Sequence, residues 1–247
     1  MDIMINGVAY PAEKGEFILA VARRNRVAIP TLCHHDGLPG QGCCRVCLVE
    51  VKEKSWTKIV TACVYPVTDG LEIFTDTERV KAVRRMTLAL LRLRAPDAER
   101  VRQLCAIYKV PDNERLAAMT GERCVLCGLC ARACLSLGTG AISSVYRGVD
   151  KKIAPPYEGA PDSCIGCGSC AATCPTNAIS MEQTPETRTI WGRVFAMRRC
   201  PDCGEPFTTE EAARHASGSA DQEAFSLCPR CRRMRIGATM RDVYGLP

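Results

Sequence analysis

The sequence predicts an α+β protein built from several small domains in series. Three observations support this fold class: short apolar runs broken by turn residues near the N-terminus, a stretch with helical apolar spacing after them, and cysteines gathered into separate groups. The chain has 247 residues, of which 18 are cysteines, and only 5% are aromatic. Because few aromatic residues limit the hydrophobic cores, we expect the cysteine groups to help hold the domains together.

Residues 1–76 are predicted to form a small α/β unit. The runs Met1–Ile5 and Val8–Tyr10 flank Asn6-Gly7, which is a strong signal for a two-residue hairpin. The other elements are expected at residues 16–24, a short helix, and at residues 48–51, 58–62 and 71–74, three strands. A strand hairpin, a helix, a cysteine loop and further strands, in this order, are typical of a ferredoxin of the β-grasp type.

The first cysteine group, the [2Fe–2S] set, lies in this unit. Its members are Cys33, Cys44, Cys47 and Cys63. Thiolates are soft ligands that select iron–sulfur clusters or zinc, and four of them on a frame of loops and strands suit a [2Fe–2S] cluster. His34 and His35 leave a Rieske-like alternative open, which is less favoured because four cysteines already complete the site. Cys43, next to a ligand, is interpreted as a packed thiol.

Residues 77–119 are predicted to be a helical linker. Apolar residues recur at helical spacing up to Pro96, which stops the first helix, and a second helix is expected from Asp97 to about Tyr108. The basic residues between them are interpreted as a solvated face in preference to a nucleic-acid surface. Cys105, among apolar residues of the second helix, is expected to be buried and inert.

Residues 120–184 contain two similar cysteine runs, and the second begins 40 positions after the first. In runs with C-x2-C-x2-C-x3-C spacing, the first three cysteines hold one [4Fe–4S] cluster and the fourth reaches the other. The first cube set is therefore Cys124, Cys127, Cys130 and Cys174. The second cube set is Cys164, Cys167, Cys170 and Cys134. Two complete runs predict a bacterial-type 2×[4Fe–4S] dicluster domain.

Residues 185–247 carry the last group, the tail set, in two C-x2-C knuckles. Its members are Cys200, Cys203, Cys228 and Cys231. Four thiolates in tetrahedral geometry suit zinc or a single iron, so we expect a zinc ribbon or a rubredoxin-like tail, with zinc favoured. The expected role of this metal is structural.

Charge and cysteine chemistry limit where the protein can work. The formal net charge is +6, but four thiolate-bound centres would each add about −2, which brings the loaded protein to roughly −2. The arginines are therefore interpreted as charge compensation, and no nucleic-acid partner is expected. We find no signal peptide and no apolar stretch of about 20 residues, so we expect a cytoplasmic protein without direct membrane insertion.

The motifs resemble a known family of electron-transfer proteins. Ile29 to Cys33, Gly42 to Glu50 and Ala62-Cys63 are similar to the amino-terminal [2Fe–2S] domain of the large iron–sulfur subunit of respiratory complex I, of iron-only hydrogenases and of the small diaphorase subunit of NAD-reducing hydrogenases. Residues 122–181 continue this resemblance. Trp191 to Arg233 resembles the carboxy-terminal knuckles of ferredoxin-like subunits from formate hydrogenlyase-type complexes. Those families usually carry a further His/Cys-ligated cluster, but residues 64–123 hold no histidine and only Cys105.

The resemblance implies an iron–sulfur subunit without a catalytic site of its own, inside a multisubunit oxidoreductase. It would relay single electrons between an NAD(P)H-linked flavin subunit and a catalytic or electron-bifurcating partner, such as a hydrogenase, a formate dehydrogenase or a heterodisulfide-reductase-like unit. We find no nucleotide-binding, phosphate-binding or flavin-binding motif in the sequence. Two alternatives stay open: a free-standing polyferredoxin that carries electrons, and a redox sensor whose ribbon binds nucleic acid.

Overall fold

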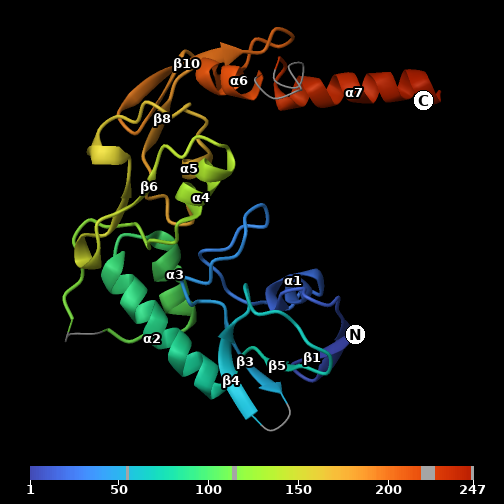
Figure 1. The fold of residues 1–247 in the computed structure, drawn as a ribbon, viewed down its shortest axis with the longest axis vertical. Coiled ribbons are helices and arrows are strands. Elements are labelled where there is room, and N and C mark those ends of the chain that lie inside the picture. The colour runs from blue at the N-terminus through green and yellow to red at the C-terminus, as the bar shows by residue number, and fades with distance from the viewer. Residues whose placement is uncertain (54–55, 113–115, 218–225, 246–247) are drawn as a thin grey trace. The chain divides into compact units, whose positions relative to one another are not determined.

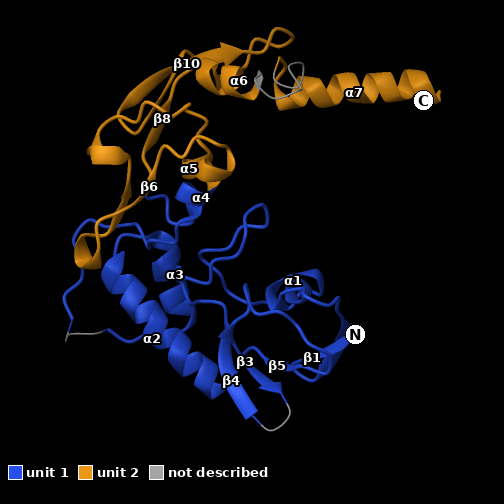
Figure 2. Cartoon of the chain, in the orientation of Figure 1, with its two compact units in different colours: residues 1–132, 173–178 blue, residues 133–172, 179–247 orange. Residues whose placement is uncertain are grey.

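The computed structural model describes residues 1–53, 56–112, 116–217 and 226–245 (Figure 1). Its contacts divide the chain into two compact units, shown in Figure 2. Unit 1 comprises residues 1–132 and 173–178, and unit 2 comprises residues 133–172 and 179–247. The division into residues 1–76, 77–119, 120–184 and 185–247, drawn from sequence pattern, remains a prediction.

Unit 1 begins with a mixed five-stranded sheet. Its elements are β1 (Asp2–Ile5), β2 (Val8–Pro11), α1 (Ile18–Arg24), β3 (Leu48–Glu53), β4 (Trp56–Thr61) and β5 (Glu72–Phe74). The strand order is β2-β1-β5-β3-β4, and β1 runs parallel to β5. Asn6 and Gly7 have φ values of +50° and +83°, as the predicted two-residue hairpin requires. Ile18, Leu19 and Val21 of α1 are buried in one apolar core with the inward side chains of β1, β3 and β5.

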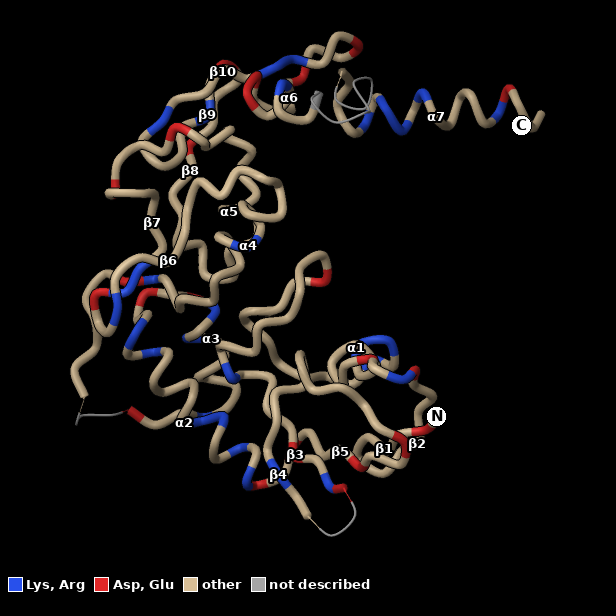
Figure 3. The backbone as a smooth tube through the Cα atoms, viewed as in Figure 1, with Lys and Arg blue, Asp and Glu red and all other residues tan. Residues whose placement is uncertain are grey.

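Unit 1 also contains two helices after the sheet, which confirm the two helices predicted for the linker. They are α2 (Glu78–Arg94) and α3 (Glu99–Ile107), separated by a break at Pro96. The Thr77 hydroxyl caps α2 by accepting a hydrogen bond from the Val80 backbone N–H at 3.2 Å. Cys105 is 5% exposed, as expected for an inert thiol. Figure 3 shows the basic residues that recur along α2.

The boundary between the units falls within α4 (Leu129–Ser136). Unit 2 then contains a hairpin, a short helix and a four-stranded antiparallel sheet with strand order β11-β10-β9-β8. Its elements are β6 (Ser143–Val145), η1 (Gly148–Asp150), β7 (Lys152–Ala154), η2 (Pro156–Glu158), α5 (Ser169–Ala172), β8 (Met181–Gln183), β9 (Thr187–Ile190), β10 (Arg193–Arg199), β11 (Pro206–Thr209), α6 (Glu210–Ser217) and α7 (Pro229–Tyr244). None of the described helices combines the length and the apolar content needed to cross a membrane.

Candidate metal centres

The [2Fe–2S] set converges in unit 1. Cys33 and Cys44 lie in the loop between α1 and β3, Cys47 directly precedes β3, and Cys63 follows β4. All four side chains are buried, and the Cys44 backbone N–H donates to Cys33 Sγ at 3.4 Å. Hydrogen bonds from the neighbouring thiols, that of Cys43 first, hold the pKa of Cys33 well below its usual range. Four thiols that interact this closely fit a centre with four thiolate ligands.

The loop around these thiols leaves no room for extra side-chain atoms. A Cβ atom on Gly40 would lie 2.7 Å from the Cys63 carbonyl oxygen. His34 Nε2 lies 3.0 Å from Asp36 Oδ1, and His35 Nδ1 accepts from the Gly37 N–H at 3.1 Å. Both imidazoles thus make hydrogen bonds within their own loop, and ligation by the four cysteines alone stays a prediction.

The interpretation of Cys43 as a packed thiol is wrong. Cys43 is exposed, and its Sγ donates to the Cys127 carbonyl oxygen at 3.4 Å. Its thiol also lies beside Cys33, whose pKa it helps to lower.

Arg84 holds the backbone of this centre from α2. Its side chain is 1% exposed, although the basic residues of this stretch were expected to form a solvated face. Its guanidinium donates to the carbonyl oxygens of Val46 at 3.2 Å and Leu48 at 2.5 Å, on either side of Cys47. A third bond reaches the Thr75 carbonyl oxygen at 3.3 Å. A buried guanidinium is tolerated when its N–H groups are satisfied in this way.

We expect Arg84→Met to lower the free energy of unfolding of unit 1 by about 3 kcal/mol or more, because three buried carbonyl groups lose their donor. Urea unfolding of the loaded chain, followed by cluster absorbance, measures this change. Arg79→Met is the matched control on the same helix. The Arg79 side chain is 57% exposed and pairs with Glu50, so its loss should cost less than about 1 kcal/mol. Equal resistance of the two variants to urea would contradict the role given to Arg84.

The two cube sets separate along the division between the units. Cys174 belongs to unit 1 with Cys124, Cys127 and Cys130, although it lies in the second run. Burial raises the pKa of Cys127 to about 11 and that of Cys130 to about 12, and the nearby charge of Cys174 adds to both shifts. Metal binding at such thiols must therefore release protons. The first cube set is thus brought together in the grouping that the spacing predicts.

The second cube set lies wholly in unit 2. Cys134, from the first run, lines one cavity together with Cys164, Cys167 and Cys170. Burial raises the pKa of Cys170 to about 11. A cavity bordered by four thiols fits a cluster with four thiolate ligands. The assignment of each cysteine to its cluster remains a prediction.

The strands after the second run reach back to the loop of the second cube set. Arg193, at the start of β10, donates to the carbonyl oxygens of Cys164 at 3.0 Å and Pro161 at 2.7 Å. Phe195 is fully buried against Gly166, where an added Cβ would lie 2.6 Å from its ring. No role was predicted for these residues from the sequence. The only local signal was that the segments on both sides of Trp191-Gly192 contain residues that favour strands.

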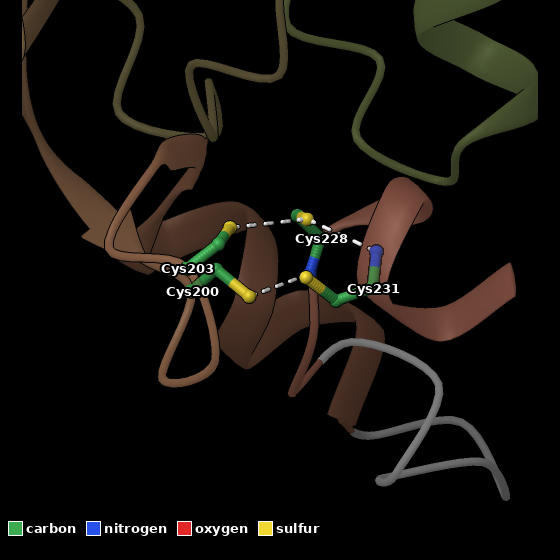
Figure 4. Close-up of side chains that lie close together, drawn as sticks. All are labelled: Cys200, Cys203, Cys228 and Cys231. Carbon is green, nitrogen blue, oxygen red and sulfur yellow. Dashed lines mark hydrogen bonds between the residues drawn. The ribbon is translucent and has the colours of Figure 1, made fainter. Parts of the chain in front are cut away.

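The tail set forms the most compact group of thiols (Figure 4). Its four sulfur atoms all lie within 4.8 Å of one another, and Cys203 Sγ and Cys228 Sγ are 3.8 Å apart. Sulfurs about 2.3 Å from one ion at the corners of a tetrahedron lie about 3.8 Å apart, so this group fits a single zinc or iron ion. The Cys228 backbone N–H, the largest influence on Cys200, helps lower the pKa of that thiol to about 6. Cys228 Sγ also caps α7 by accepting from the Cys231 N–H.

Comparison with protein families identifies two domains. Residues 1–78 match the model of a 2Fe-2S iron-sulfur cluster binding domain, and residues 117–181 match that of a 4Fe-4S dicluster domain. The chain is therefore a mixed α/β protein with a [2Fe–2S] domain and a [4Fe–4S] dicluster domain.

Curated proteins are similar to most of the chain, and three of them illustrate the range. It is 29% identical over 252 residues to the NADP-reducing hydrogenase subunit HndD of Solidesulfovibrio fructosivorans, covering 88% of this chain and 41% of that protein. It is 28% identical over 215 residues to the NADH-ubiquinone oxidoreductase 75 kDa subunit of Reclinomonas americana, covering 77% and 31%. It is 26% identical over 264 residues to the NADPH-Fe(3+) oxidoreductase subunit alpha of Geobacter sulfurreducens (strain DL-1 / KN400), covering 96% and 31%.

Among the solved structures, the fold is shared by a hydrogenase chain. It is a chain from the crystal structure of an NAD+-reducing [NiFe]-hydrogenase in the H2-reduced state, with a TM-score of 0.55 and 24% identity, covering 62% of this chain and 74% of that one. The predicted resemblance to iron–sulfur subunits of complex I and of hydrogenases is confirmed, and that of residues 191–233 to the knuckles of formate hydrogenlyase-type subunits stays a prediction. The present chain spans less than half of the length of each of the three curated relatives.

Proposed function

We propose that the chain is an iron–sulfur electron-transfer subunit of a multisubunit oxidoreductase. It carries one [2Fe–2S] cluster, two [4Fe–4S] clusters with crossed ligation and one structural zinc ion, each on the set of cysteines given above. It relays single electrons between an NAD(P)H-linked flavin subunit and a catalytic or electron-bifurcating partner. The names of the three relatives, which mention NADP, NADH and NADPH, support the nicotinamide link.

The observation that carries this proposal is the shared core of two cysteine groups in unit 1. Cys33 and Cys44 of the [2Fe–2S] set lie in one buried cluster with Cys127 of the first cube set. Arg132 on α4 ties the two loops together, since it donates to the Cys33 carbonyl oxygen at 3.0 Å. Sites that pack side by side without intervening solvent suit the passage of single electrons.

The direct packing of the [2Fe–2S] set on the first cube set agrees with the lack of ligands for a further cluster in residues 64–123. Residues 64–123 hold no histidine and only Cys105, which is buried between α2 and α3 with its Sγ 3.6 Å from the Leu88 carbonyl oxygen. The further cluster that related families carry therefore has no ligand set in this stretch. The proposed route runs from the [2Fe–2S] set to the first cube set without that station.

The chain's own residues hold and shield the clusters. When bound, the clusters would accept and donate single electrons. The cysteines fix their positions, the buried apolar residues of α2 and α3 exclude water, and backbone N–H groups donate to sulfur. Among these, the Leu126 N–H lies 3.4 Å from Cys124 Sγ and the Ala178 N–H 3.3 Å from Cys174 Sγ. Such hydrogen bonds and burial adjust the cluster potentials.

Two finer structural assignments belong to the same proposal. The sheet of unit 1, with β1 parallel to β5 and α1 packed on it, supports the β-grasp assignment. The tail set supports a zinc ribbon, with zinc favoured over iron as the usual ion of closed four-thiolate structural sites. The proposed compartment is a reducing one such as the cytoplasm, because cysteines that bind clusters must stay reduced.

Anaerobic purification of the tagged full chain from its native cells tests the proposed function. We expect a flavin-containing complex in which NADH or NADPH reduces the clusters, as followed by electron paramagnetic resonance (EPR). The isolated chain should hold the same clusters but need dithionite for their reduction. A chain that purifies alone, with clusters that NAD(P)H does not reduce in cell extract, would favour the free polyferredoxin and overturn the subunit role.

A further inference from the structure

The turn between β9 and β10 presents a tryptophan in an unusual backbone conformation. Trp191 and Gly192 have φ values of +53° and +74°, and the flanking residues Ile190 and Arg193 pair across the hairpin. Two-residue turns of this kind favour asparagine followed by glycine, and a bulky residue with positive φ is strained. Strain of this sort persists when the side chain has another task. Here the indole Nε1–H donates to Cys170 Sγ at 3.4 Å.

This indole hydrogen bond is a difference between the two cube sets. Backbone N–H groups donate to sulfurs of both sets, among them those of Leu126 and Ala178 in the first and those of Gly166 and Ala141 in the second. A threonine hydroxyl lies near the fourth cysteine of each run, Thr176 near Cys174 and Thr139 near Cys134. No described side-chain N–H donates to a sulfur of the first cube set. Trp191 therefore gives the second cube set a side-chain N–H donor, and the described part of the chain offers none to the first cube set.

Two arginines also bond to the loop of the second cube set. Arg188, which is 9% exposed, donates to the Gly166 carbonyl oxygen at 2.9 Å and to Gln183 Oε1 at 2.9 Å. The bonds of Arg193 given above also go to carbonyl oxygens. Neither guanidinium is within ion-pair distance of a described carboxylate. A buried cation needs a compensating anion, and a cluster with four thiolates supplies one.

Beside the first cube set, Arg94 has a carboxylate partner. Its positive charge lowers the pKa of Cys124, but its guanidinium lies 3.6 Å from the Glu122 carboxylate, whose negative charge raises the same pKa. Arg132, which lies between Cys130 and Cys134, donates to the carbonyl oxygens of Cys33 and Pro39, so each cube set has a guanidinium bonded to backbone carbonyl groups. The feature that distinguishes the second cube set is the side-chain N–H of Trp191, beside the buried Arg188.

We propose that Trp191, supported by Arg188 and Arg193, raises the reduction potential of the cluster in the second cube set. Reduction adds one negative charge, and N–H donors and cations stabilise the more negative state. This inference rests on the proposed cluster ligation.

Trp191→Phe in the full-length, loaded chain tests the proposal, because it removes the N–H and keeps an aromatic ring. We expect the ratio of reduced to oxidised second cluster, at one fixed solution potential, to fall about three- to tenfold, where tenfold equals about 59 mV for one electron. EPR-monitored redox titration measures this ratio, and Cys164→Ser identifies the signal of the second cluster. The other two clusters should keep their potentials. Trp56→Phe, on β4, is the matched control and should change none.

A second variant separates electrostatics from strain. Trp191→Asn places the favoured residue in the turn, so the hairpin should be more stable while the potential still falls. Unchanged potentials in both variants, with all clusters present, would overturn this inference and leave the proposed function standing. Loss of the second cluster from both variants would also overturn it, because Trp191 would then be purely structural. A wild-type chain without [4Fe–4S] signals after reconstitution would overturn the proposed function itself.

Discussion

Cys174→Ala is expected to remove the cluster held by Cys124, Cys127 and Cys130, and to spare the cluster of its own run. The reason is that Cys174 lies in unit 1, where its negative charge raises the pKa of all three of those thiols. Iron content should fall by up to about four atoms per chain, since a [4Fe–4S] cluster needs its fourth thiolate. Iron analysis and EPR of the anaerobically reconstituted chain measure the loss.

Cys134→Ala is the mirror variant and should remove the other cluster. Cys134 lines the cavity of Cys164, Cys167 and Cys170, so its loss leaves that site with three ligands. The surviving cluster in each variant can be recognised by adding Trp191→Phe. After Cys174→Ala the surviving potential should respond to this change, and after Cys134→Ala it should not.

Cys105→Ala and Cys43→Ala are controls for the loss of a thiol. Cys105 is buried near the Leu88 carbonyl oxygen, and Cys43 is exposed, so both variants should keep all three clusters. If Cys174→Ala instead abolished the cluster that responds to Trp191→Phe, ligation would follow the runs and the crossed assignment would be wrong.

The features that the sequence predicted well are those set by local chemistry. Asn6-Gly7 needs only its own two residues to adopt the hairpin turn, and α2 follows from apolar spacing and the break at Pro96. The cube sets could be grouped because C-x2-C-x2-C-x3-C spacing reflects the shape of the cluster.

The features that were missed depend on distant contacts. The residues of β8 are all exposed, so this strand has no alternating pattern to reveal it, and β9 and β10 gain their role only by meeting a loop more than 20 residues earlier, as Arg188 does at Gly166. Arg84 looks like its exposed neighbours in sequence, since only the fold brings the carbonyl groups of Val46 and Leu48 to it. The turn at Trp191 was hidden because tryptophan stands where asparagine is usual.

The tail set gives the second prediction with a large effect. Cys228→Ala is expected to release the metal and unfold the two knuckles and α7. Cys228 contributes twice, as a ligand 3.8 Å from Cys203 Sγ and as the cap of α7. Structural zinc sites of four ligands contribute on the order of 10 kcal/mol to folding, which is more than this short segment can replace by apolar burial. Its core consists of the cysteines, Leu227 and the half-buried Phe207.

Metal analysis and limited proteolysis measure this result. Zinc content should fall from about one ion per chain to none, and cleavage should concentrate at the two knuckles and in α7. The iron of the three clusters should stay, because Arg188 and Arg193 make their bonds from β9 and β10, which precede Cys200. The Thr209 hydroxyl on β11 donates to the Ile165 carbonyl oxygen, and this strand is held by its pairing with β10 and not by the metal alone. A chain that keeps its metal in Cys228→Ala would exclude the four-thiolate site. Loss of cluster iron together with the zinc would mean that the ribbon also holds the hairpin against the second cube set, and would give the tail a part in setting its potential.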